Sequence, residues 1–220
     1  MRYKAIIFDL DGTLIDSLDD IASSVNRVLA ANRFASHSAL AYRDFIGDGV
    51  GQLIRRALPQ SVSSDEQLVA QFLSAYAADY RNSWSVATKL YPGIASALDD
   101  LSIAGLKLAV LSNKPDEFTQ ACASLFLADW NFDVVMGASD RFPHKPDPAS
   151  ALEIARLLGF APAEMLYLGD MPVDMLTARN SGMLAIGAAW GFRTRQQLVD
   201  AGADIVIDHP GELADLARGK

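Results

Sequence analysis

Two aspartates near the N-terminus could share a metal ion. Asp9 and Asp11 directly follow the apolar run at residues 5–8, which has the length and composition of a buried strand. Alternate side chains of a strand point the same way, so the two carboxylates can converge at its tip. Close carboxylates repel each other unless a cation or a proton lies between them. The pair therefore indicates a metal-dependent reaction centre at the carboxyl end of a strand, where open α/β sheets bind ligands.

Further polar side chains follow three later strands, which we expect at residues 106–111, 134–136 and 165–168. They are Ser112, Asn113, Lys145, Asp170 and Asp174. Each alone is typical of a helix cap or a solvated loop. Together, at successive strand tips, they favour one site that contains a hydroxyl, an ammonium group and four carboxylates.

The elements that must position these residues alternate between helix and strand. Such alternation is typical of βαβ units and predicts an α/β fold with a Rossmann-like parallel sheet, which the strand before Asp9 must join. The further elements that we expect are helices at 94–104, after Pro115, at 149–158, 173–180 and 213–217, and strands at 183–186 and 205–207.

Residues 15–85 show only helical periodicity. We expect helices that begin after Ser17, run from Val50 to Pro59, and extend over about 65–81. The sequence thus predicts a core domain at 1–14 and 86–220, and an α-helical cap domain at 15–85. An insertion directly behind the aspartate pair is well placed to be a lid, although a helical domain unrelated to the site stays open.

Composition limits the classes of partner and the compartment. The chain has 220 residues and a net charge of −8, which argues against a nucleic-acid surface. An anionic substrate would need a local cluster of cations. Cys122 is the single cysteine, which fits a reducing compartment, and the N-terminal apolar run is too short for a signal peptide or membrane span. We expect a soluble cytoplasmic protein that is a monomer or a homodimer.

The order of these motifs resembles the haloacid dehalogenase superfamily of phosphohydrolases. Its four motifs are matched by Asp9-x-Asp11-Gly12-Thr13, Ser112, Lys145-Pro146-Asp147-Pro148 and Gly169-Asp170-x-x-x-Asp174. The resemblance spans most of the chain. It implies a Mg²⁺-dependent phosphatase that acts on a small phosphorylated metabolite.

The resemblance implies a division of labour among the carboxylates. Asp9 is expected to attack phosphorus and form an aspartyl-phosphate, while Asp11 protonates the leaving oxygen and then activates water. Mg²⁺ is expected on Asp9, Asp170 and the backbone carbonyl of Asp11. Asp174 is expected to orient water on the ion. Direct binding of the ion by Asp174 stays open.

The resemblance also implies groups that bind phosphate oxygens. Ser112, the backbone N–H groups around Asn113, and Thr13 are expected to contact the phosphate. Lys145 is expected to balance the charge of both Asp9 and the phosphate.

A glycine-rich loop in the helical block is a candidate for substrate contact. Gly47-Asp48-Gly49 precedes a helix that carries Arg55 and Arg56. N–H groups at a helix start and a nearby arginine could bind a small carboxylate. Adjacent arginines diverge by about 100° on a helix, so only one can face a site, and Arg55 is our candidate.

Short signatures resemble the phosphoglycolate phosphatase-like subgroup and favour 2-phosphoglycolate as the substrate. They are Gly47-Asp48-Gly49-Val50, Tyr91-Pro92-Gly93, Leu111-Ser112-Asn113-Lys114 and Ala189-Trp190-Gly191-Phe192. Met171 departs from the pattern, because a small hydroxylated residue is common there. Sugar phosphates, nucleotides, pyrophosphate and phosphomutase activity stay open, whereas a non-enzymatic binding protein is disfavoured.

Overall fold

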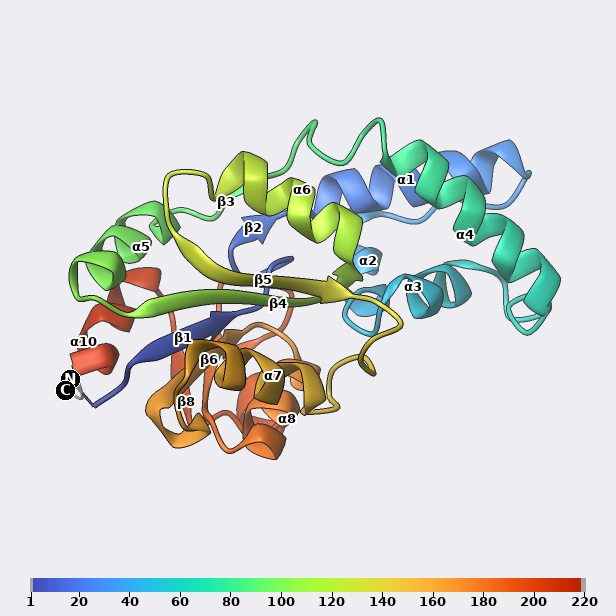
Figure 1. Ribbon diagram of the computed structural model, residues 1–220. Helices are drawn as coiled ribbons and strands as arrows, with labels where there is room; N and C mark the ends of the chain where they lie inside the picture. The colour runs from blue at the N-terminus through green and yellow to red at the C-terminus, as the bar shows by residue number, and fades with distance from the viewer. Residues whose placement is uncertain (1, 219–220) are drawn as a thin grey trace. The chain divides into compact units, whose positions relative to one another are not determined.

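A parallel sheet of six strands organises most of the molecule. A computed structural model describes residues 2–218, and Figure 1 shows its helices and strands. The strand order is β5-β4-β1-β6-β7-β8, and every pairing is parallel. The strands are β1 (Ala5–Phe8), β4 (Lys107–Pro115), β5 (Phe132–Ala138), β6 (Met165–Gly169), β7 (Leu184–Ala188) and β8 (Ile205–Ile207). The predicted α/β fold with a parallel sheet is confirmed.

Helices cover both faces of this sheet (Figure 1). They are α5 (Ile94–Ile103), α6 (Asp116–Phe126), α7 (Ala149–Leu158), α8 (Pro172–Ser181), α9 (Arg195–Asp200) and α10 (Leu213–Arg218). Alternate strand side chains point to opposite faces, so Ile7 and Tyr167 pack with Ile154 of α7 and Met175 of α8 on one face. Ile7 of β1 and Tyr167 of β6, which are paired in the sheet, are both fully buried. This packing makes the strands a rigid support for the loops at their ends.

The chain divides into two compact units. One comprises Met1–Ile15 and Leu90–Lys220, here called the sheet unit, and the other comprises Asp16–Lys89, here called the helical unit. The helical unit contains α1 (Leu18–Ala31), α2 (Ala39–Phe45), α3 (Val50–Ala57) and α4 (Glu66–Tyr80). Ser17 occupies the N-cap position of α1, and the Asp65 carboxylate caps α4 by accepting from two backbone N–H groups.

Several elements differ from the sequence-based expectation. The structure adds α2, α9 and two strands of two residues each, β2 (Ile15–Asp16) and β3 (Lys89–Leu90), which pair with each other. The block at 15–85 is therefore not entirely helical at its start. Strand β4 extends to Pro115, beyond the expected end at residue 111. Elements of two to seven residues are too short to show a hydrophobic periodicity. The last residues of β4 are mostly polar, so they lack the apolar pattern that indicates a buried strand.

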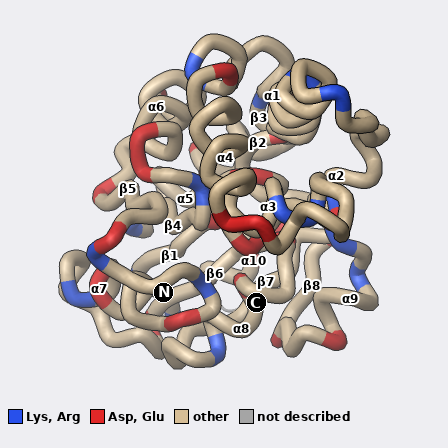
Figure 2. Tube along the Cα trace, turned by 90° about the vertical axis from the view of Figure 1, so that its right-hand side faces the viewer, with Lys and Arg blue, Asp and Glu red and all other residues tan. Residues whose placement is uncertain are grey.

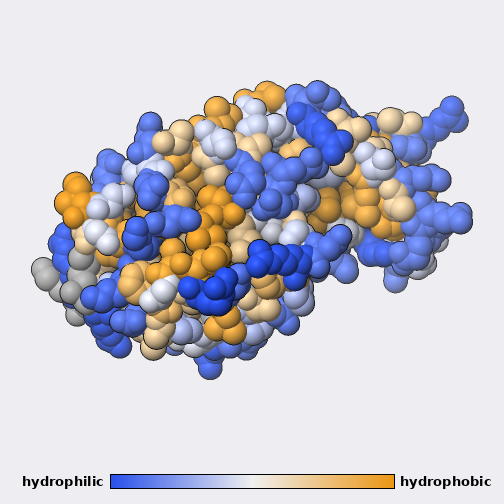
Figure 3. All heavy atoms as spheres, in the orientation of Figure 1, coloured by the Kyte–Doolittle hydropathy of each residue, from blue (hydrophilic) through white to orange (hydrophobic). Residues whose placement is uncertain are grey.

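Charged side chains of both signs are spread along the chain, whereas apolar side chains gather on part of the surface. Figure 2 shows Lys and Arg interspersed with Asp and Glu along the trace. Figure 3 shows apolar side chains reaching the surface over β4 and β5, at one edge of the sheet. Among residues 2–218, the helices are too short or too polar to cross a membrane.

Candidate active site

Asp9 lies at the end of β1, in the middle of the sheet. β1 pairs with β4 on one side and with β6 on the other. The tips of those neighbours therefore flank Asp9, whose exposed fraction is only 6%. One carboxylate oxygen of Asp9 accepts from the backbone N–H of Leu10 at 2.7 Å. The position of β1 between β4 and β6 explains why residues that follow later strands can contact the same carboxylate.

Lys145 joins the site from the loop after β5. Its Nζ lies 2.8 Å from Asp9 Oδ1 and 2.7 Å from Asp174 Oδ1, and it donates to the carbonyl of Leu111 at 3.2 Å. Burial alone would lower the pKa of Lys145. The carboxylates of Asp174 and Asp9 outweigh that effect and hold the pKa well above its usual value. Lys145 is therefore a permanent ammonium group between two carboxylates.

Asn113 fixes the backbone of Lys145. Its side-chain Nδ2 donates to the carbonyl of Lys145 at 3.1 Å, and its Oδ1 accepts from the N–H of Lys145 at 2.9 Å. The pair of hydrogen bonds attaches the loop after β5 to the end of β4. The Asn113 side chain thus positions the lysine, in addition to any contact of the Asn113 backbone with a ligand.

Three buried carboxylates converge beside Lys145. One oxygen from each of Asp9, Asp170 and Asp174 lies within 4.8 Å of the others. Burial, together with the charge of Asp174, raises the pKa of Asp9 from 3.8 to about 7. Burial and the charges of Asp9 and Asp174 also raise the pKa of Asp170 well above its usual value. In the absence of a cation, the surroundings therefore oppose ionisation of Asp9 and Asp170.

This cluster fits a hard divalent cation. The described residues place four carboxylates at this strand edge, Asp9, Asp11, Asp170 and Asp174, against two buried ammonium groups. When all four carboxylates are ionised, the excess of two negative charges matches the charge of Mg²⁺, and Mg²⁺ prefers oxygen ligands. Asp9, Asp170 and Asp174 could hold the ion. The carboxylate of Asp11 lies outside the cluster of three. The contact expected from Asp11 is made by its backbone carbonyl, and it stays a prediction.

Asp11 instead forms an ion pair with Lys114. Lys114 Nζ donates to Oδ1 at 2.9 Å and to Oδ2 at 3.2 Å. Both side chains are largely buried. Sequence reasoning assigned no role to Lys114, because the pairing depends on how the tips of β1 and β4 lie side by side. The only indication in the sequence was that Lys114 directly follows Ser112 and Asn113, two of the predicted site residues.

Thr13 and Ser112 have protein partners in this structure. The hydroxyl of Thr13 donates to Asp170 Oδ1 at 2.9 Å, and the other oxygen of Asp170 accepts from the backbone N–H of Phe192 at 2.8 Å. Ser112 Oγ accepts from the N–H of Lys114 at 3.2 Å. The Thr13 hydroxyl therefore orients a carboxylate of the cluster. Its predicted contact with phosphate stays a prediction.

Two glycines permit the close packing around Asp170. Gly12 has a φ of +87°, and a Cβ on it would lie 2.7 Å from the carboxyl carbon of Asp170. A Cβ on Gly191 would lie 2.5 Å from the carbonyl oxygen of Gly12. Trp190 Nε1 also donates to the carbonyl of Thr13 at 3.0 Å. The segment 189–192, noted in the sequence as a signature, thus packs against the turn that follows Asp11.

The expected substrate-contact residues of the insertion lie in the helical unit. Gly47 and Gly49 have φ values of +123° and +85°, and Gly49 is the N-cap residue of α3. Arg55 is directed toward the start of α4, where it donates to the carbonyl of Ser63 at 2.9 Å and pairs with Glu66 at 2.6 Å. The adjacent Arg56 lies against the glycine loop, contacting Asp48 and, at 3.1 Å, the carbonyl of Phe45.

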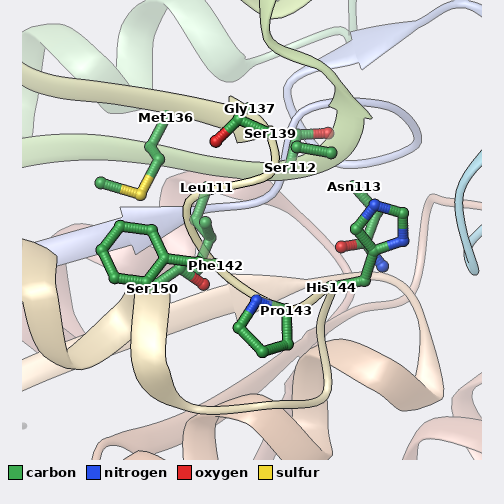
Figure 4. A pocket seen from close by; sticks show the side chains of 11 residues that line it. Leu111, Ser112, Asn113, Met136, Gly137, Ser139, Phe142, Pro143, His144 and Ser150 are labelled. Atoms are coloured by element: carbon green, nitrogen blue, oxygen red, sulfur yellow. The ribbon is translucent and has the colours of Figure 1, made fainter.

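A pocket opens where β4 and β5 end (Figure 4). Its lining includes Ser112 and Asn113 from β4, Gly137 from β5, and Ser139 and His144 from the loop before α7. The pocket brings hydroxyl, amide and imidazole groups next to the residues that the sequence predicts for phosphate binding.

Comparison with known proteins places this geometry in a family. A family model described as haloacid dehalogenase-like hydrolase matches residues 6–188. A phosphoglycolate phosphatase of Vibrio vulnificus strain CMCP6 is 33% identical over 219 residues, covering 97% of this chain and 95% of that relative. Phosphoglycolate phosphatase 1 of Pseudomonas aeruginosa is 29% identical and is covered to 79% of its length, with 97% of this chain aligned.

Solved structures agree with this assignment. A crystal structure from Lactobacillus delbrueckii subsp. bulgaricus has a TM-score of 0.94 and 29% identity, with 100% of both chains covered. A predicted phosphoglycolate phosphatase from Haemophilus somnus 129pt has a TM-score of 0.91 and 27% identity, with 98% of each chain covered. With the family match extending over most of its length, the chain belongs to the haloacid dehalogenase-like hydrolases, as its motifs predicted.

Proposed function

We propose that this hydrolase is a Mg²⁺-dependent phosphatase of small phosphomonoesters, with 2-phosphoglycolate as its substrate. The observation that carries the proposal is the buried contact of 2.8 Å between Asp9 and Lys145 at the tip of the central strand. It joins a carboxylate nucleophile to a cation that can also balance phosphate charge. The names of the relatives, aligned over nearly the whole chain, support the substrate. The single cysteine supports a cytoplasmic location.

The residues of the site have complementary roles in this reaction. A carboxylate oxygen of Asp9 attacks phosphorus, and the bond from phosphorus to the leaving oxygen breaks. Asp11 gives a proton to that oxygen, then accepts one from the water that hydrolyses the aspartyl-phosphate. Lys145 and the hydroxyl of Ser112 face the charge that develops on the phosphoryl oxygens.

A bound Mg²⁺ would stabilise the charge of the carboxylates and of the phosphoryl group. Within the chain, Asp9, Asp170 and Asp174 would hold it, and Thr13 keeps Asp170 oriented through the hydrogen bond of 2.9 Å. Because Lys145 also contacts Asp9, the nucleophile is held in one position before substrate binds.

We further propose that the helical unit selects the substrate. Its loop Gly47-Asp48-Gly49 precedes α3 and carries positive φ values, so its backbone N–H groups can be presented to a ligand. Arg55 is the arginine that the sequence favours, whereas Arg56 is the one that contacts Asp48. Separate alanine variants, assayed for KM and kcat, distinguish the two.

Hydrolysis assays test the proposed function directly. The purified chain is incubated with 2-phosphoglycolate, pyrophosphate, nucleotides, hexose phosphates and a generic aryl phosphate, in Mg²⁺ and in EDTA. We expect Mg²⁺-dependent phosphate release with the highest kcat/KM for 2-phosphoglycolate, and no release by Asp9→Asn. Activity of Asp9→Asn equal to wild type would overturn the phosphatase mechanism. A higher kcat/KM for hexose phosphates would overturn the substrate alone.

A further inference from the structure

Lys114 is a buried ammonium group that contacts the carboxylate assigned to proton transfer. Its Nζ lies 2.9 Å and 3.2 Å from the two oxygens of Asp11. The exposed fractions of the two side chains are 5% and 12%. Lys145, the other buried lysine of residues 2–218, contacts Asp9 and Asp174 instead. Each aspartate of the first strand tip thus has its own lysine.

We propose that Lys114 determines specificity by binding a carboxylate on the leaving group of the substrate while it positions Asp11. The substrate class is a phosphomonoester whose leaving group carries a carboxylate close to the ester oxygen. This inference rests on the proposed function, because it takes Asp11 as the group that protonates the leaving oxygen. It assigns a discriminating contact to the sheet unit, in addition to any contact made by the helical unit.

Distances support a contact between Lys114 and such a leaving group. Proton transfer requires the leaving oxygen to lie about 2.6–3.2 Å from the Asp11 carboxylate. Since Lys114 Nζ lies 2.9 Å from that carboxylate, the leaving oxygen must come within about 6 Å of Nζ. In a glycolate leaving group, the carboxylate oxygens lie roughly 3 Å beyond the ester oxygen, given bonds of about 1.5 Å. The substrate carboxylate can therefore reach Nζ.

The chemistry of the ammonium group suits this double contact. An ammonium group has three N–H donors and no acceptor, so it can bridge two carboxylates. Its flexible stem allows Nζ to shift toward a second anion while it remains near the first. A shared lysine would keep its contact with Asp11 and would also hold a leaving group that carries a carboxylate, which brings the leaving oxygen beside Asp11. Binding of the anion and orientation of Asp11 would then occur together.

The charge of the surroundings makes a local cation necessary for an anionic leaving group. The chain has a net charge of −8, and four carboxylates lie at this edge of the sheet. A carboxylate that enters beside Asp11 would be repelled unless a cation offsets the repulsion. Lys145 already lies between Asp9 and Asp174. Lys114 is the buried cation that adjoins the proposed position of the leaving oxygen.

Two substrates of equal length test the inference. 2-Phosphoglycolate and 2-hydroxyethyl phosphate differ by a carboxylate and a hydroxymethyl group on the leaving side. We expect Lys114→Met to lower kcat/KM for 2-phosphoglycolate on the order of 100-fold, as for loss of one partner of a buried charge pair, and to lower it far less for the neutral ester. We expect Lys114→Arg to retain the preference, because it retains the charge.

Further measurements separate specificity from a merely structural role. Glycolate should inhibit the wild-type enzyme competitively, whereas ethylene glycol should not, and Lys114→Met should lose inhibition by glycolate. Equal losses of kcat/KM on both esters, with unchanged inhibition by glycolate, would overturn the inference. The inhibition measurements on the wild-type enzyme test the inference even if Lys114→Met fails to fold. If glycolate does not inhibit the wild-type enzyme, the inference is overturned as well.

The same experiment distinguishes failure of the inference from failure of the proposed function. If the wild-type enzyme hydrolyses both esters in Mg²⁺ with equal kcat/KM, the role of Lys114 is refuted and the phosphatase activity stands. If it hydrolyses neither these esters nor the aryl phosphate, the proposed function is refuted, and the inference with it.

Discussion

Replacing the proposed nucleophile Asp9 by Asn should stabilise the protein in the absence of divalent ions. The pKa of Asp9 is raised from 3.8 to about 7 by burial and by the neighbouring Asp174. Folding therefore opposes ionisation of Asp9, even though Lys145 partly offsets the effect. An asparagine has nearly the shape of a protonated aspartate and carries no charge. The folded state of the Asp9→Asn variant should therefore not be destabilised by a buried carboxylate at this position.

The size and pH dependence of the gain follow from the two pKa values. A rise of about three units corresponds to roughly 4 kcal/mol, since each unit is 1.36 kcal/mol. Between pH 3.8 and 7 the folded state binds more protons than the unfolded state, so the stability of the wild-type protein falls as pH rises. The gain from Asp9→Asn should be about 4 kcal/mol at pH 8, about 2 kcal/mol at pH 5, and absent below pH 3.8.

Urea unfolding in EDTA at pH 5 and pH 8 measures this gain. EDTA is needed because a bound cation would itself stabilise the ionised carboxylate of the wild-type protein. Asp129→Asn is the matched control, because it removes an exposed aspartate remote in sequence from the site motifs, and we expect it to leave the free energy of unfolding unchanged. Loss of stability for Asp9→Asn at pH 8, or a gain that does not shrink at pH 5, would refute the electrostatic reasoning.

Two further changes test other parts of the structure. Gly12→Ala should reduce hydrolysis at least 10-fold, because its Cβ would collide with the carboxyl group of Asp170 while φ is +87°; wild-type kcat/KM would contradict this. In the helical unit, a double-mutant cycle of Arg27→Ala and Asp79→Ala should give a coupling energy of about 0.5–1 kcal/mol for the half-exposed pair. The guanidinium of Arg27 lowers the pKa of Asp79, so this stabilisation should be present at neutral pH and lost as pH falls below 3.8; an unchanged coupling at pH 2.5 would refute it.

The sequence predicted those features that depend on local pattern. The alternation of helices and strands placed the sheet, and the polar residues behind successive strands pointed to one site. Asp9, Lys145 and Asp174 do lie together in the structure. This prediction was possible because parallel strands bring their carboxyl ends to the same edge.

Features that depend on contacts between distant segments could not be read from the sequence. The pair formed by Asp11 and Lys114 requires the spatial relation between β1 and β4. The contact of Thr13 with Asp170 requires the turn after β1 to lie against the tip of β6. Arg55 and Arg56 are adjacent in α3 and differ in the side of the helix on which each lies. Helical spacing says that they diverge, but not which one adjoins the glycine loop.

The position of β1 has a consequence for synthesis of the chain. β1 precedes both of its partners in the chain, because β4 and β6 begin 102 and 160 residues after Ala5, at Lys107 and Met165. The cost of closing such long loops is compensated only when those partners are available. During translation the apolar residues of β1 therefore have neither partner strand until β4 has emerged, and they have only one until β6 has emerged. During that interval the unpaired apolar strand is exposed to aggregation.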